Sequence, residues 1–167
     1  AMGKVFVLLD KEGKARFAEL NEAVSATAEQ FGFAKLDIAS ALFDIFSAES
    51  TTIDKAKELL TTTASLARGG FSQTATTTST LITLMKTYGD QLRDTGDAAD
   101  FLAQVANKGR LDLEALAGGF GAILAPAEAA RMALADVGAL VATATNVIAF
   151  PHVVGAFPSF AKMFGGA

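Results

Sequence analysis

The sequence predicts an all-α fold, an array of short antiparallel helices (helical hairpins) joined by Gly-centred turns. The first proline is Pro126, so 125 residues pass without the residue that costs about 3 kcal/mol in a helix interior. Apolar residues recur at the three- and four-residue spacing of one helix face. Glycines separate these apolar stripes, where a left-handed residue can end one helix before the next begins.

The N-terminal segment, residues 1–17, fits two local structures. Val5 to Leu9, followed by Asp10-Lys11-Glu12-Gly13, is typical of a strand and turn and equally of the start of a helix. A short N-terminal hairpin is therefore the alternative to helix in this segment.

From residue 18 onward the sequence predicts helices near 18–31, 37–48, 53–68, 73–88, 97–108, 112–124 and 128–147. The apolar stripes that support three of them are Ile38, Leu42, Ile45 and Phe46; Leu81, Leu84, Met85 and Tyr88; and Leu113, Leu116, Phe120 and Ile123. The predicted helix ends are Gly32, Gly69-Gly70, Gly89, Gly96 and Gly109, and the predicted N-caps are Thr52, Ser72, Thr95 and Asp112. Connections this short make consecutive helices antiparallel neighbours.

A weak internal repeat accompanies this pattern. The acidic start at Asp54 and the similar start at Asp97 lie 43 residues apart, and each leads to a glycine. This offset falls within the range of helical-hairpin repeats.

The composition excludes several functional classes. Hydrophobic residues make up 51% of the chain and charged residues only 19%, against about 25% in typical domains. There is no Cys and one His, which excludes disulfides, thiolate metal sites and poly-His centres. The net charge of −4 has the wrong sign for a nucleic-acid-binding surface. An apolar, weakly charged chain of this kind is suited to packing and association.

The C-terminal end is the compositional outlier, because residues 137–161 carry no charge. A membrane-spanning helix needs about 20 apolar residues, and Pro151 interrupts the run too early for that. We therefore expect a buried or oligomer-facing helix followed by an apolar Pro/Gly-containing tail over residues 150–167.

The acidic residues between 90 and 100 resemble two kinds of catalytic or metal site. Asp94-Thr95-Gly96 matches the aspartic-protease tripeptide, but that chemistry needs two carboxylates on loops between strands. Asp97 and Asp100, like Asp90 and Asp94, share a helix face, yet no Glu-x-x-His motif accompanies them. Capping and first-turn charges explain these residues better.

The remaining candidates also favour structural roles. Gly118-Gly119-Phe120-Gly121 is neither a phosphate-binding loop nor a dinucleotide fingerprint, and reads as a smooth patch that a helix approaches closely. Lys108 and Arg110 are typical of a solvated helix end, and His152 of a structural or surface residue. The sequence predicts no catalytic, cofactor-binding or metal-binding residue and therefore no enzyme.

Several segments resemble the core region of phage tail tape-measure proteins, over roughly residues 28–147. The order and spacing of these segments carry the resemblance: 37–48, 64–70, 81–89, 97–100, 109–117 and 125–129. The chain departs from the family pattern at Met132-Ala133-Leu134, where the family usually starts a helix with a Gly-Val-Ser-like segment.

The resemblance implies a helical core-like domain over residues 18–149 of a virion protein, and a chain that is a fragment of a longer one. Such proteins lie inside the tail, set its length during assembly in the host cytoplasm, and leave ahead of the DNA. The implied partners are copies of the same chain around a symmetry axis, tail-tube and tail-tip or baseplate proteins, and the host membrane during ejection, without sequence-specific nucleic acid. The alternatives are a membrane-active helical protein that inserts its charge-free C-terminal segment, and a helical protein-binding module.

Overall fold

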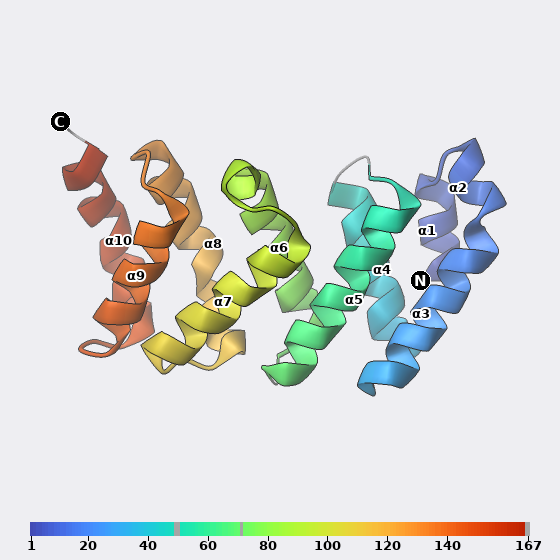
Figure 1. The fold of residues 1–167 in the computed structure, drawn as a ribbon, viewed down its shortest axis with the longest axis horizontal. Helices are drawn as coiled ribbons and strands as arrows, with labels where there is room; N and C mark the ends of the chain where they lie inside the picture. Colours follow the sequence, from blue (N-terminus) through green and yellow to red (C-terminus); the bar gives the residue numbers. More distant parts are fainter. Residues whose placement is uncertain (49–50, 71, 166–167) are drawn as a thin grey trace. The chain divides into compact units, whose positions relative to one another are not determined.

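The computed structural model describes residues 1–48, 51–70 and 72–165. In this part of the chain every regular element is helical and no strand is present, which confirms the all-α prediction. The chain divides into two compact units, Ala1–Ile82 and Thr83–Ala167, and Figure 1 shows the helices of each.

The first unit contains five helices and most of a sixth: α1 (Met2–Leu8), α2 (Lys11–Ala15), α3 (Phe17–Phe31), α4 (Lys35–Ala48), α5 (Ile53–Gly69) and the start of α6 (Thr74–Tyr88). The predicted alternative of an N-terminal hairpin is wrong, because Asp10 accepts the backbone N–H of Gly13 at 2.7 Å and starts α2. Helix α4 packs against α1, α3 and α5, and α3 also packs against α5. The core of this first unit contains the fully buried side chains Leu20, Ile38, Leu42 and Leu60.

The second unit contains the end of α6, the short 3-10 helix η1 (Gly89–Gln91), α7 (Thr95–Gly109), α8 (Leu113–Ala129), α9 (Leu134–Thr145) and α10 (Phe150–Gly165). Alternate helices pack side by side, since α7 contacts α9 and α8 contacts α10 (Figure 1). Its core contains the fully buried side chains Leu84, Leu102, Leu116, Phe120, Ile123, Leu124 and Phe157.

The spacing of the helices reveals a repeat of about 39 residues. Helix α4 begins at Lys35, α6 at Thr74 and α8 at Leu113, which are 39 residues apart, and α10 begins 37 residues later at Phe150. Within each unit, packing between alternate helices is the arrangement that stacked helical hairpins adopt.

The threonine-rich stretch of α6 is helical, as the 3.6-residue period predicted. Its buried hydroxyls are satisfied inside the helix: Thr78 donates to the carbonyl of Thr74 at 2.7 Å, and Thr80 donates to that of Thr76 at 2.9 Å. This back-bonding to residue i−4 lets β-branched polar residues occupy a buried helix. On the predicted apolar face, Leu81, Leu84 and Tyr88 are buried and Met85 is half-buried.

Two predicted N-caps are confirmed and a third is shifted by one residue. The hydroxyl of Thr52 and the carboxylate of Asp112 accept the backbone N–H groups of Lys55 and Ala115. Helix α7 is capped by Asp94 rather than Thr95, which is the first residue of the helix. Ser72 lies two residues before α6, and its hydroxyl bonds to that of Thr77.

The predicted left-handed glycine is confirmed only at Gly32, which ends α3 with φ 71°. At the end of α7 the left-handed residue is Arg110, with φ 54°, and not Gly109. Gly109 instead lies in contact with α9, where an added Cβ would stand 2.6 Å from the Oγ1 of Thr145.

The predicted boundary between the helices at 112–124 and 128–147 is wrong. Helix α8 continues through Pro126 to Ala129, and the next helix begins only at Leu134. Pro126 lies in the last turns of α8, where its missing N–H and ring remove a single internal hydrogen bond. Arg131, with φ 56°, then ends the turn, and the N–H of Met132 donates to the carbonyl of Ala127 at 3.0 Å.

Residues from Phe150 onward, expected as an apolar tail, form α10 as far as Gly165. Pro151 occupies the first turn of this helix, where a missing N–H costs nothing. Helix α10 buries Phe150, Val153, Phe157 and Ala161 and packs on α8 and α9. None of the helices over residues 1–48, 51–70 and 72–165 is long and apolar enough to cross a bilayer.

Candidate functional site

Asp94 and Asp97 lie at the N-terminus of α7. The carboxylate of Asp94 accepts the backbone N–H of Asp97 at 2.9 Å. The guanidinium of Arg93 donates to both oxygens of Asp97, at 2.6 Å and 2.7 Å, and this hydrogen-bonded ion pair lowers the pKa of Asp97. Asp94 therefore caps the helix and Asp97 lies in its first turn, as predicted, whereas the ion pair with Arg93 was not predicted.

The remaining candidates of this region lie in a helix cap, in a 3-10 helix and in the second turn of α7. Asp94, Thr95 and Gly96 form a helix cap and first turn, not a loop between strands. Asp90 lies in η1, and Asp100 lies one turn after Asp97 in α7. Over the described ranges no three His, Asp or Glu side chains are close enough to hold a metal ion together.

The glycine-rich segment of α8 receives a close neighbour from the same unit. A Cβ at Gly119 would stand 2.6 Å from Cε1 of Phe150 and 3.1 Å from Cγ2 of Val154, both in α10. Gly118 and Gly121 face open space. The smooth patch predicted for a neighbouring helix is thus used by α10 at Gly119.

Lys108 and Arg110 lie at the end of α7, and His152 lies on the surface of α10. The carbonyl of Lys108 accepts the side-chain amide of Asn146 at 2.9 Å, which ties the end of α7 to the end of α9. Arg110 is the left-handed residue that ends α7. His152 is exposed in the first turn of α10.

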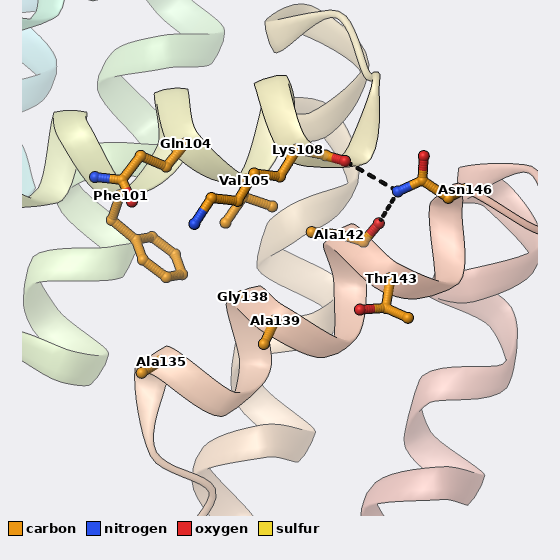
Figure 2. Close-up of a pocket in the computed structure, with 10 residues that line it drawn as sticks. All are labelled: Phe101, Gln104, Val105, Lys108, Ala135, Gly138, Ala139, Ala142, Thr143 and Asn146. Atoms are coloured by element: carbon orange, nitrogen blue, oxygen red, sulfur yellow. Dashed lines mark hydrogen bonds between the residues drawn. The ribbon is translucent and has the colours of Figure 1, made fainter.

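The second unit has a groove between α7 and α9 that the sequence analysis did not predict. It has a volume of about 420 Å³, and Figure 2 shows the residues that line it: Phe101, Gln104, Val105 and Lys108 from α7, and Ala135, Gly138, Ala139, Ala142, Thr143 and Asn146 from α9. The ring of Phe101 lies over Gly138, where a Cβ would stand 2.6 Å from Cε2 of the ring. Small residues at helical spacing along α9 were the signal that could have predicted this groove.

The chemistry of this groove favours contact over reaction. Its floor is made of small and apolar side chains, and its polar groups are an amine, amides and a hydroxyl. The lining contains no carboxylate and no imidazole that could act as a general base. The groove can hold apolar side chains of a partner, and Gln104 and Lys108 can form hydrogen bonds with polar groups of that partner.

A charged cluster that joins α3 to α5 was also missed. The guanidinium of Arg16 donates to both oxygens of Glu19, at 2.8 Å and 2.9 Å, and to Asp54 at 3.0 Å, while Lys57 donates to Glu19 at 2.5 Å. Hydrogen bonds from Arg16 and then Lys57 lower the pKa of Glu19 to about 2. Arg16 likewise lowers the pKa of Asp54. The members of each inter-helix pair lie 38 residues apart, as do Lys108 and Asn146, so the repeat length was the available signal.

The residues described above make contacts between helices, and comparison with known proteins shows the family of the chain. A family model described as phage-related minor tail protein matches residues 12–150. The chain belongs to the phage-related minor tail protein family. This match confirms the predicted tape-measure-like resemblance at the level of the family. No curated protein and no solved structure matches this member of the minor tail family.

Proposed function

We propose that this chain is a structural tail protein of the tape-measure type, which packs inside the tail or tail tip, sets tail length and leaves ahead of the DNA. The match of residues 12–150 to a phage-related minor tail protein model carries this proposal. The matched range is close to residues 18–149, which we propose as the tape-measure core-like domain, preceded by a segment over 1–17 and followed by one over 150–167.

The physical properties of the chain support a structural role without an enzymatic one. The candidate carboxylates are occupied by a helix cap and an arginine, and the groove between α7 and α9 offers contacts without a general base. We propose that copies of the same chain, tail-tube proteins and tail-tip or baseplate proteins are the partners, in the host cytoplasm during assembly and then in the virion. A net charge of −4 disfavours sequence-specific binding to nucleic acid.

Membrane activity has weaker support as an alternative. The charge-free segment forms most of α9, a turn and α10 as far as Ala161, and α10 packs on α8 and buries Phe150, Val153 and Phe157. Insertion would therefore require α10 to leave α8, at the cost of the packing that buries Phe150, Val153 and Phe157. A general helical binding module is the remaining alternative and is consistent with the groove alone.

A deletion of one repeat tests the tape-measure role. Removal of residues 74–112 in frame, in the genome that encodes the chain, takes away the 39 residues between the start of α6 and the start of α8. If the length of this chain sets the length of the tail, tails measured by electron microscopy should be shorter than those of the parent phage. Duplication of the same residues is the matched control and should lengthen them equally. Unchanged tail lengths in both phages would reject the role.

A further inference from the structure

The groove between α7 and α9 combines an apolar lining with one charged side chain. Phe101 and Val105 lie on the α7 side, and Gly138 and Ala142 lie on the α9 side (Figure 2). Among the described residues that line the groove, Lys108 is the only charged one. Figure 2 shows its side chain running back along α7 beside Val105, so that its amine lies over apolar groups.

The amine of Lys108 has no carboxylate partner within the described part of the chain. Its backbone carbonyl accepts the amide of Asn146, but none of the ion pairs over the described residues includes its Nζ. The contact between α3 and α5 differs in this respect, because Arg16 and Lys57 are both paired with carboxylates there. An unpaired cation beside apolar side chains therefore gives the groove a preference for an anionic group.

The shape of the groove suits a helix. It extends along α9 from Ala135 to Asn146, which is about 16 Å at 1.5 Å per residue and therefore about three helical turns. A helix that lies in such a groove presents large side chains three to four residues apart. Ala135, Ala139 and Thr143 are exposed and small, so they leave room for those side chains.

The described part of this chain does not itself offer a helix with both properties. Its large exposed apolar side chains lie mainly on α1 and α10, whose charged residues are Lys4 and Lys162 without any acidic residue. Either helix of a second copy would bring a further positive charge to Lys108. Helix α4 has acidic residues, but Leu36 is its one large exposed apolar side chain among the described residues. The groove therefore fits a different chain better than a second copy.

We propose that the groove between α7 and α9 binds an amphipathic helix of another tail protein, with apolar side chains over Ala139 and an aspartate or glutamate paired with Lys108. The inference rests on the proposed function, because it takes the partner from the tail, and it adds the surface and the chemistry of that partner. The ion pair fixes the register and orientation of the bound helix. The apolar side chains that leave water supply the driving force.

Photo-cross-linking in assembled tails tests this contact. Benzoylphenylalanine replaces Ala139, which is exposed in the groove, and in a second phage it replaces Ala122, which is exposed on α8 outside the groove. Purified tails are irradiated, and the cross-linked peptides are identified by mass spectrometry. The expected product at position 139 joins this chain to a different tail protein, in a segment with apolar residues at helical spacing and an acidic residue. At position 122 that product should be severalfold weaker or absent.

A charge exchange tests the role of Lys108. Lys108→Glu should lower both the yield of this cross-link and the number of infectious phage severalfold, because two carboxylates then face each other. Replacement of the acidic residue of the cross-linked partner by lysine should restore both. Arg68→Glu is the matched control, because Arg68 is an exposed basic residue of the last turn of α5, as Lys108 is of α7, and lies outside the groove.

The other outcomes separate this contact from the tail function. A cross-link from position 139 to a second copy of the chain would overturn the proposal in favour of self-association. No protein cross-link at position 139, in tails that contain the chain, would reject the groove contact and leave the tail function standing. Equal losses in Lys108→Glu and Arg68→Glu, or no rescue by the exchanged partner, would reject the ion pair and with it the proposal. Absence of the chain from purified tails would reject the proposed function itself.

Discussion

The hydroxyl of Tyr88 donates a hydrogen bond to the backbone carbonyl of Met132 at 3.1 Å, and both residues are buried. This bond joins the end of α6 to the turn between α8 and α9, in which Arg131 holds a left-handed conformation. Removal of the hydroxyl leaves a buried carbonyl without its partner. Tyr88→Phe should therefore lower the free energy of unfolding by about 1–3 kcal/mol, measured by urea denaturation followed by circular dichroism.

A pH titration tests the burial of the same phenol group. Burial raises the pKa of Tyr88, so the folded state holds the phenolic proton more tightly than the unfolded state. The resulting stability is complete below the unfolded pKa of about 10 and is lost as the pH rises through the folded value. Tyr88→Phe should weaken this alkaline loss, and an identical alkaline loss in both proteins would contradict the prediction.

The buried apolar face of α6 should matter more than the acidic start of α7. Leu84 is fully buried, and Leu84→Ala should cost about 2–5 kcal/mol through lost transfer energy and a cavity. Asp97→Asn removes an exposed ion pair with Arg93, and Asp100→Asn removes a charge in the second turn of α7, so both should cost far less than Leu84→Ala. Denaturation of the three variants, with and without a divalent metal, checks the ranking. A larger loss at either Asp, or metal-dependent stability, would instead indicate a metal site.

Two neighbouring glycines of α8 should respond to alanine with opposite sign. Gly118 has open space where a Cβ would lie, so Gly118→Ala should stabilise the helix by up to about 1 kcal/mol. Gly119 lies under the ring of Phe150, and Gly119→Ala should destabilise the protein by about 1–3 kcal/mol through overpacking. Thermal denaturation of both variants measures the difference, and equal effects would show that α10 does not pack on Gly119.

Thr63 carries a buried hydroxyl that has no hydrogen-bond partner in the described structure. Thr63→Val replaces this hydroxyl with a methyl group of similar size and should raise the free energy of unfolding by about 1 kcal/mol. Thr78→Val is the control, because the hydroxyl of Thr78 bonds to the carbonyl of Thr74 and its loss should not stabilise the protein. Chemical denaturation that places Thr63→Val below the natural chain would refute this prediction.

Acid should weaken the contact between α3 and α5. The pKa of Glu19 is lowered to about 2 and that of Asp54 is also lowered, so both carboxylates bind protons more weakly in the folded state. Their stabilisation is present above the unfolded values near 4 and is lost as the pH falls toward 2. Glu19→Gln should flatten the fall in melting temperature between pH 5 and pH 2. Glu22→Gln, at an exposed position of the same helix, should leave that fall unchanged; a similar flattening in both variants would contradict the assignment.

The sequence alone determined the helical class of the protein and most of its helix starts. The long run without proline and the 3.6-residue spacing act within a few residues, so Thr52 and Asp112 could be predicted as caps from neighbouring positions. The same local reasoning explained Asp94 and Asp97 as helix-start residues. The order and spacing of segments between residues 37 and 129 also predicted the tail-protein family to which residues 12–150 belong.

The tertiary structure decided the features that depend on residues about 40 positions apart. Gly109 and Gly119 are close-contact glycines because α9 and α10 pack against them, and no local pattern distinguishes such a glycine from one that ends a helix. Helix α8 continues through Pro126 because its last turns bury Leu124 and Ala127, and this packing offsets one lost hydrogen bond. The charged cluster of Arg16, Glu19, Asp54 and Lys57 forms only when α3 and α5 lie side by side. Contacts between helices decide which charged side chains form ion pairs and which residues are buried, and those contacts exist only in the folded chain.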